Sequence, residues 1–247
     1  MASDVVHPPS ARREPIERIG ATVLRELVEL IVSGEVRPGE QLPPEGMLSQ
    51  QFGVSRTVVR EAIKRIQEKG LLSVSQGRGT KVNARTDWNM LDPLVLAISI
   101  QRDDDLRVLD ELSAVRSALE SVMAAATAAA ATDEEVAELR AIAGRMHDSI
   151  DDPEVFRAAD VQFHAAVMRM SGNALAENIA GTLLDRALDS ARFHGRDPEH
   201  AFELTVAEHD RVLDAIAEHD ADTAKSAMKA HIDDSWRRRR PAAGQAE

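Results

Sequence analysis

Hydrophobic residues recur every three or four positions along most of the chain, which is the spacing of an amphipathic helix. The pattern predicts helices over residues 16–33, 45–52, 56–69, 93–101, 105–130, 133–150, 153–171, 173–194, 201–218 and 221–238. Only two short segments, LLSVSQ and TKVNA on either side of the turn GRG, suggest strands. The chain is therefore predicted to be mainly α-helical.

The first eighty-five residues contain a helix-turn-helix pattern. EGMLSQQF ends at Gly53, and a second helix follows with Ser55 as its N-cap and RTVVREAIKRIQEK as its body. The hydrophobic positions of the second helix leave four polar side chains on the other face and at the N-terminal end, where recognition helices contact bases: Arg56, Thr57, Arg60 and Lys64. The alternative is that these side chains form only a solvated helix face and contact no DNA. With the strand pair behind it, the segment is predicted to be a winged helix-turn-helix.

Charge is distributed unevenly between the two halves of the chain. The formal net charge is -12, yet residues 11–85 carry thirteen Lys and Arg against nine Glu, a net of +4, and residues 86–247 carry a net of -15. Attraction to phosphate is a local property, so the acidic total does not exclude DNA binding by the first part.

The length is sufficient for two domains, each with its own core. We expect a disordered N-terminus at 1–10, the winged helix-turn-helix at 11–84 and a linker at 85–92. An antiparallel helical bundle at 93–238 and a disordered tail at 239–247 complete the expected organisation. Cysteine is absent, which excludes disulfides and thiolate chemistry, and no signal peptide or membrane span is apparent. These features predict a soluble cytoplasmic protein with no membrane partner.

Three helices of the second part place polar residues on their hydrophobic faces. These residues are Asp160, His164, His209 and His231. A single histidine in such a position is usually a core residue with a hydrogen-bond partner. Three imidazoles with one carboxylate also suit zinc, nickel, manganese or iron(II), with zinc the first choice, and the spacing of four places Asp160 and His164 on adjacent vertices of one ion.

Arginines interrupt the same hydrophobic faces. Arg116 lies within a leucine-rich stripe, Arg192 follows another, and Thr205 lies one turn before His209. A buried guanidinium implies an anionic partner. That partner is either a bound carboxylate effector or a side chain of the protein itself, such as Glu120 or Asp160.

Two segments carry a family resemblance. SGEVRPGEQLPPEGMLSQQFGVSRTVVREAIKRIQEKGLLSVSQGRGTKV resembles the DNA-binding domain of GntR-family bacterial transcriptional regulators. The resemblance implies phosphate or base contacts from Ser55, Arg56, Thr57 and Arg60, with Gln76 and Gly77 of the wing entering the minor groove. Many members carry a DNA-contacting arginine at the position that is Gly46 here, so that contact is missing or supplied elsewhere.

The second segment covers residues from about 93 to 236. ELSAVRSALE, DVQFH, EHDRVLDAI and MKAHI are similar to the FCD ligand-binding domain of the FadR subgroup. The resemblance implies a divalent metal held by Asp160, His164, His209 and His231, and a small carboxylate effector coordinated to that metal. DWNMLDPLVL is further similar to galactonate-type regulators of sugar-acid catabolism.

Together these features predict a homodimeric, metal-containing repressor that binds near-palindromic operator DNA and releases it when a small carboxylate, such as an aldonate, binds. Arg116, Arg192 and Thr205 are the expected effector contacts. Two alternatives are a metal-dependent hydrolase or lyase in a helical bundle, and a metal-free regulator of a larger acyl ligand.

Overall fold

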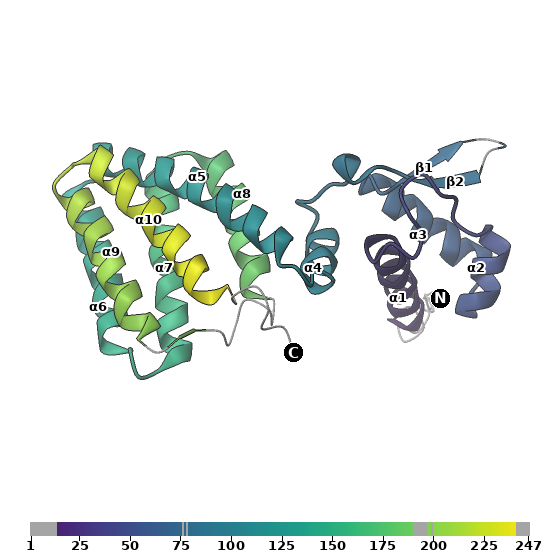
Figure 1. Ribbon diagram of the computed structural model, residues 1–247, viewed down its shortest axis with the longest axis horizontal. Helices are drawn as coiled ribbons and strands as arrows, with labels where there is room; N and C mark the ends of the chain where they lie inside the picture. The colour runs from purple at the N-terminus through teal and green to yellow at the C-terminus, as the bar shows by residue number, and fades with distance from the viewer. Residues whose placement is uncertain (1–13, 76, 78, 190–196, 199, 241–247) are drawn as a thin grey trace, which may run out of the picture. The chain divides into compact units, whose positions relative to one another are not determined.

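The computed structural model describes residues 14–75, 77, 79–189, 197–198 and 200–240. It divides into two compact units, Met1–Arg102 and Asp103–Glu247 (Figure 1). The expected disordered N-terminus, and the tail from residue 241 onward, lie outside the described residues. None of the helices among the described residues is long and apolar enough to cross a membrane.

The N-terminal unit is a winged helix-turn-helix, as the sequence predicts. Its elements are α1 (Glu14–Val32), α2 (Glu45–Phe52), α3 (Arg56–Glu68), the strands β1 (Leu72–Ser75) and β2 (Gly79–Val82), the 3-10 helix η2 (Arg85–Asp87) and α4 (Pro93–Gln101). The strands pair antiparallel with Leu72 opposite Val82, and Gln41 forms an isolated bridge to Lys81 beside them. Leu27, Leu48 and Ile66 belong to the buried core that holds α1, α2 and α3 together.

The turn between α2 and α3 is set by two residues. Gly53 adopts the left-handed conformation with φ of 64°, which costs a glycine little and ends α2. Ser55 caps α3 by accepting a hydrogen bond from the backbone N–H of Val58. These two residues therefore fix where the second helix begins and which of its side chains face outward.

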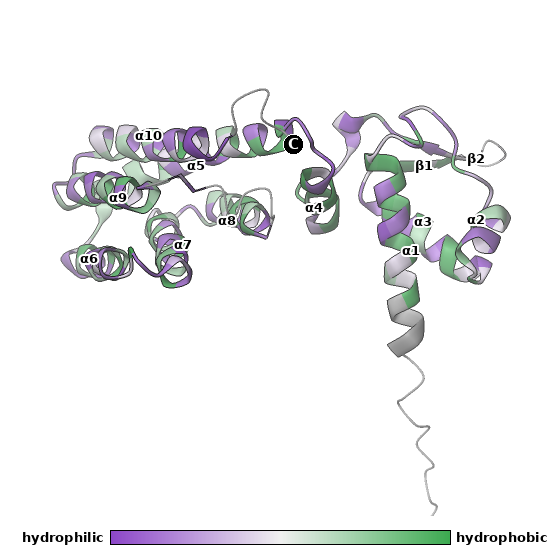
Figure 2. Cartoon of the chain, turned by 60° about the horizontal axis from the view of Figure 1, so that its bottom comes forward, coloured by the Kyte–Doolittle hydropathy of each residue, from purple (hydrophilic) through white to green (hydrophobic). Residues whose placement is uncertain are grey.

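The boundary between the units falls after Arg102, beyond the linker expected at 85–92. Trp88, Val95 and Ile98 are buried in the core of the N-terminal unit, and α4 packs against α1. Figure 2 shows α4 as almost entirely hydrophobic. The helix therefore belongs to the N-terminal unit and not to the helical bundle in which we expected it.

In the part of the C-terminal unit that the structure describes, six helices form a bundle. They are α5 (Arg107–Ala130), α6 (Asp133–Asp148), α7 (Pro153–Met170), α8 (Ala174–Leu188), α9 (Ala201–Ala217) and α10 (Ala221–Arg239). The helix α10 packs on both α5 and α9, α6 packs on α7 and α9, and α5 packs on α8. Phe156, Phe163 and Met228 are among the residues that fill the core.

Two details of the bundle differ from the sequence expectation. The spacing of four in Val155, Ala159 and Phe163 predicts Val155 on the inward stripe of α7, but Val155 is half exposed and Phe156 is buried in its place. The helix α10 includes Arg239, and both Arg239 and Arg240 form ion pairs, although the tail was expected to begin at 239. Carboxylates on other segments hold these arginines in place, and a reading of α10 alone does not reveal them.

Candidate nucleic-acid interface and metal centre

The exposed face of α3 carries the side chains that the sequence assigns to DNA. Arg56, Thr57, Arg60 and Lys64 are all exposed, whereas Val59, Ala62, Ile63 and Ile66 are buried against the core of the N-terminal unit. Ser55 caps the helix, so its hydroxyl lies at the N-terminal end of the same face. The arrangement presents three cations and two hydroxyls on one helix.

Two residues of α2 lie next to two of these arginines. The Arg60 guanidinium donates two hydrogen bonds to Glu45, from Nη2 to Oε2 at 2.9 Å and from Nε to Oε1 at 3.3 Å. A Cβ atom on Gly46 would lie 3.2 Å from Nη2 of Arg56. The Arg56 guanidinium therefore lies next to the space that a side chain at position 46 would take.

The wing is the hairpin of β1 and β2. Gly77 is exposed at its tip with φ of 76°, a conformation that favours glycine. Gln76, the other predicted wing contact, lies outside the described residues.

The four predicted metal ligands converge in the C-terminal unit. Asp160 and His164 come from α7, His209 from α9 and His231 from α10, and one ligand atom of each lies within 4.8 Å of the others. His164 Nε2 is 3.2 Å from His231 Nε2 and 3.3 Å from His209 Nε2. Asp160 Oδ1 lies 3.6 Å from His209 Nε2. The three imidazoles are buried, and Asp160 is partly exposed.

Two buried glutamates form hydrogen bonds with the Nδ1 atoms of two of these histidines, on the side of each ring away from the cluster. Glu120 of α5 accepts a hydrogen bond from His164 Nδ1 at 2.6 Å, and Glu208 of α9 accepts one from His231 Nδ1 at 2.9 Å. Each glutamate is also paired with an arginine. Arg116 Nε lies 2.6 Å from Glu120 Oε1, and Arg238 donates to both oxygens of Glu208. Sequence reasoning considered Glu120 only as a partner of Arg116 and missed Glu208.

These contacts keep both glutamates ionised. Burial favours the neutral form of Glu120, but the charges of Arg116 and His164 and their hydrogen bonds lower its pKa to about 2. Burial opposes ionisation of Glu208 as well, and the hydrogen bonds and charges of His231 and Arg238 lower its pKa to about 2. An ionised carboxylate accepts hydrogen bonds and cannot donate them. Nδ1 of His164 and of His231 must therefore carry the proton.

This protonation decides what the cluster can bind. In a neutral imidazole with a proton on Nδ1, Nε2 carries only a lone pair. The Nε2 atoms of His164 and His231 lie 3.2 Å apart, so two neutral imidazoles present lone pairs to each other there, and either a proton on one Nε2 or a bound cation makes the contact favourable. Burial, followed by the charges of His231 and His164, also lowers the pKa of His209 well below its usual value. The donor set and its protonation therefore fit a divalent cation.

A cavity of about 40 Å³ opens next to the cluster. Asp160, His164 and His231 contribute to its wall, as do Arg116 and several leucines, including Leu112 and Leu184. Arg116 thus both pairs with Glu120 and lines the cavity, so the two roles considered for it are compatible. Thr205 is buried on α9 one turn before His209 but is not among the residues that line this cavity. Arg192 lies outside the described residues.

Comparison with known proteins agrees with both halves of the structure. Residues 19–82 match the family described as bacterial regulatory proteins, gntR family, and residues 111–234 match the FCD domain. The galactonate operon transcriptional repressor of Escherichia coli strain K12 is 33% identical over 84% of this chain and 91% of its own length. The HTH-type transcriptional repressor NanR of Enterobacter sp. strain 638 is 31% identical over 90% of this chain and 86% of its own length.

A solved structure shows the same fold. The structure of Lar, which controls expression of the Listeria monocytogenes agr system, superposes with a TM-score of 0.56 over 89% of this chain and 95% of that chain, at 19% identity. The matched families and relatives are transcriptional regulators and not enzymes, which removes the hydrolase or lyase alternative. The chain belongs to the GntR family of bacterial transcriptional regulators, with a winged helix-turn-helix followed by an FCD domain.

Proposed function

We propose that this regulator is a repressor of an operon for the catabolism of a sugar acid or a related small carboxylate, and that the effector binds at a metal centre in the C-terminal unit and releases DNA. The observation that carries the proposal is the pair of facing Nε2 atoms of His164 and His231, with Asp160 beside them at the wall of a cavity. Both named relatives are repressors, and the galactonate operon repressor supports the class of operon. A regulator that binds chromosomal DNA would act in the cytoplasm.

Asp160, His164, His209 and His231 would hold the metal, with zinc the first choice and nickel, manganese or iron as alternatives. The bound ion would offer its open coordination positions to carboxylate and hydroxyl oxygens of the effector. Glu120 and Glu208 hold two of the imidazoles in the tautomer that leaves Nε2 free for this ion. Arg116 lines the same cavity, and its terminal N–H groups are suited to an effector carboxylate.

The size of the cavity links effector binding to a change in the domain. A volume of about 40 Å³ holds about three water molecules, which is less than a sugar acid requires. Binding would therefore favour an arrangement in which the surrounding helices or side chains have moved apart. A ligand shifts a protein toward the state that it binds more tightly, and we propose that this state holds the two recognition helices at a spacing that does not fit the operator.

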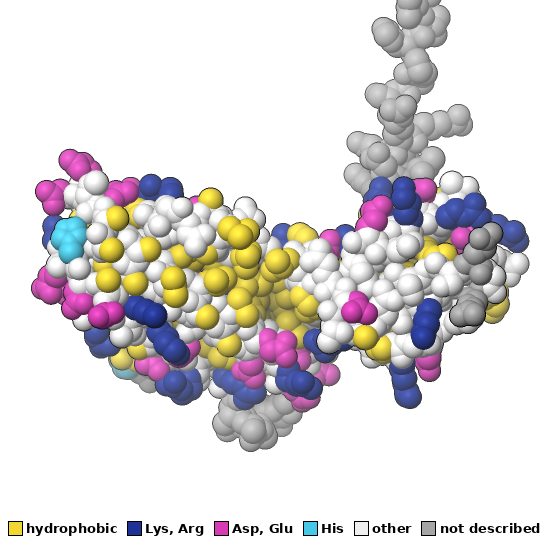
Figure 3. Space-filling view, turned by 90° about the horizontal axis from the view of Figure 1, so that it is seen from above, with side chains coloured by type: hydrophobic (Ala, Val, Ile, Leu, Met, Phe, Trp, Pro, Cys, Tyr) yellow, Lys and Arg dark blue, Asp and Glu magenta, His cyan; other side chains and the backbone are white. Residues whose placement is uncertain are grey.

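On the DNA side, α3 would enter the major groove with Ser55, Arg56, Thr57, Arg60 and Lys64, and the wing with Gln76 and Gly77 would reach the adjacent minor groove. Two copies are needed for a near-palindromic operator. Exposed hydrophobic side chains on the C-terminal unit support a homodimer (Figure 3). Val115 and Val122 on α5 are 44% and 53% exposed, and Leu175 on α8, which packs on α5, is 73% exposed.

The dimer interface is tested by replacing Val122 with Glu. Charge repulsion and the cost of burying an unpaired carboxylate should shift the protein to a monomer in sedimentation velocity while its helical circular dichroism stays unchanged. A dimer of undiminished stability in the Val122→Glu protein would show that the second copy binds elsewhere.

The metal is tested by elemental analysis of untagged protein prepared without chelators. We expect close to one divalent ion per chain, and loss of that ion in the His209→Ala and His231→Ala variants, together with a lower melting temperature. Metal-free wild-type protein that binds no added zinc, nickel, manganese or iron(II) would show that the histidine cluster is part of the core alone.

A further inference from the structure

The cavity beside the metal ligands has a second polar end. Arg157 of α7 and Arg239 of α10 contribute to its wall, and both pair with Asp197, which also lines it. Nη2 of Arg157 lies 3.0 Å from Asp197 Oδ2, and Nε of Arg239 lies 2.8 Å from Asp197 Oδ1. One carboxylate is thus held between two guanidinium groups.

Position along the two helices separates this arginine pair from the metal-ligating histidines, whereas Asp160 lies only three residues, or about 4.5 Å of helix rise, after Arg157. Arg157 precedes His164 by seven residues on α7, which is a rise of about 10 Å, and Arg239 follows His231 by eight residues on α10, a rise of about 12 Å. Both helices therefore carry histidine at one level of the cavity and arginine at another. Ser113 and Ser235 also line the wall and supply hydroxyl groups.

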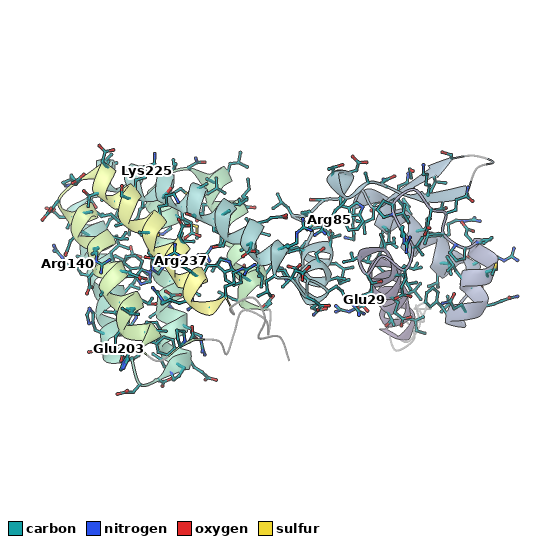
Figure 4. The ribbon with its side chains drawn as sticks, in the orientation of Figure 1. Glu29, Arg85, Arg140, Glu203, Lys225 and Arg237 are labelled. Atoms are coloured by element: carbon teal, nitrogen blue, oxygen red, sulfur yellow. The ribbon has the colours of Figure 1, made fainter. Side chains whose placement is uncertain are left out.

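The pairing of Arg239 differs from that of the other arginines at the C-terminal end of α10. Arg237, labelled in Figure 4, is paired with Asp234 of its own helix, Arg238 with Glu208 and Arg240 with Asp110, one carboxylate for each arginine. Asp197 instead pairs with both Arg157 and Arg239, so two guanidinium groups share one carboxylate at this end of the cavity. A divalent ion held by Asp160 would leave one excess positive charge at the other end.

We propose that Arg157 and Arg239 form a second anion-binding subsite, so that the effector is a sugar diacid with one carboxylate at the metal and the other at this arginine pair. The Asp197 carboxylate occupies the subsite in the structure described here and competes with the effector's distal carboxylate. This inference rests on the proposed function, because it places the first carboxylate at the proposed metal centre. It adds a preference for diacids over monoacids, which neither the histidine cluster nor the named relatives imply.

The state of Asp197 is consistent with this role. Burial raises its pKa, but the charge of Arg239 and hydrogen bonds from Arg157 and Arg239 outweigh that effect and lower it. Asp197 is therefore an ionised carboxylate, the same chemical group as the distal end of a diacid. The side chain of Arg157 is 33% exposed, so it can move toward a ligand more easily than the arginine of α10.

The test compares ligands that differ only in the terminal group. Galactonate and galactarate share a carbon skeleton, as gluconate and glucarate do, and only the second of each pair has two carboxylates. Calorimetric titration of metal-loaded wild-type protein should show tighter binding of a diacid than of its monoacid, by about tenfold or more, which is about 1.4 kcal/mol.

Three variants identify the origin of that preference. Arg157→Gln should reduce diacid affinity to the level of the monoacid and change monoacid affinity less than twofold. Asp197→Asn should raise diacid affinity, because it removes the competing charge. Arg169→Gln is the matched control, since Arg169 lies on the same helix, is exposed, pairs with Glu138 and does not line the cavity. Circular dichroism checks that each variant folds.

The outcomes separate this inference from the proposed function. Equal affinity for monoacid and diacid, with no effect of Arg157→Gln on either, would overturn the second subsite and leave the metal-centred proposal intact. Failure of all four sugar acids to bind metal-loaded protein would overturn the choice of sugar acids, and the second subsite with it.

Discussion

Replacement of Glu208 with Gln tests whether the buried glutamates hold the histidines for a metal. Oε2 of Glu208 accepts hydrogen bonds from both His231 Nδ1 and Arg238 Nη2, and Oε1 accepts one from Arg238 Nη1. A glutamine has one acceptor oxygen, and its amide N–H₂ must face one of these donors. The variant therefore keeps the volume of the side chain and removes the charge that fixes the tautomer of His231.

The structure gives a magnitude for this effect. Burial raises the pKa of Glu208, yet its partners lower it from 4.5 to about 2, which corresponds to about 3 kcal/mol in favour of the ionised form. Part of that energy belongs to Arg238, so the share that acts through His231 is smaller. We expect metal affinity to fall by about 10- to 100-fold, the usual effect of removing such a partner, which is about 1.4 to 2.7 kcal/mol.

The assay is a zinc titration against a competing chromophoric chelator, with thermal unfolding of metal-free protein to check the fold. Glu203→Gln is the control, because Glu203 lies on the same helix but is exposed and pairs only with exposed His200 among the described residues (Figure 4). It should leave zinc affinity unchanged. Zinc affinity of the Glu208→Gln protein within twofold of wild type would refute the role of the glutamate in fixing His231.

Three further predictions address the DNA surface, the effector and pH. Arg60→Ala should weaken specific operator binding by about 1 to 3 kcal/mol per half-site, and unchanged affinity in a gel-shift titration would remove α3 from the interface. Arg116→Ala should stay dimeric and metal-loaded yet fail to release DNA when effector is added, whereas a normal release curve would make Arg116 only a partner of Glu120. Metal-free protein should become less stable as the pH falls below about 6.5, the ordinary pKa of histidine. Burial, followed by the charges of His231 and His164, lowers the pKa of His209 in the folded protein. Below a pH of about 6.5 the unfolded chain therefore takes up a proton at His209 that the folded protein does not, which favours unfolding. Urea unfolding at pH 7.5 and 5.5 should show this loss in wild type and a smaller one in His209→Gln, and identical losses would contradict the assignment.

Helical periodicity was sufficient to predict the four proposed metal ligands. A side chain's position on the hydrophobic face of its own helix follows from spacing alone, and that is why Asp160, His164, His209 and His231 were found together. Their supporting glutamates depend on pairing between helices. Glu208 immediately precedes His209, so it points about 100° away from it around α9, and its contact with His231 of α10 is not visible in either helix alone.

Two other features could not be read from local pattern. The segment Pro93–Gln101 is hydrophobic on all sides, so its sequence does not show which core it joins, and it packs on α1 in the N-terminal unit. The run of four arginines from Arg237 is typical of a solvated helix end. The ion pairs of Arg239 and Arg240 depend on Asp197 and Asp110, which lie on other segments.

The central claim is that a small carboxylate releases DNA through the metal centre. It is tested most directly by fluorescence anisotropy of a labelled DNA fragment that the protein has itself selected from a random library, titrated with sugar monoacids and diacids in metal-loaded and in metal-stripped protein. The account predicts that at least one sugar acid lowers the anisotropy of the metal-loaded complex, and that the same ligand has no effect on the metal-stripped complex until zinc is restored. Release of DNA to the same extent with and without metal, or retention of DNA by metal-loaded protein at every ligand concentration, would contradict it.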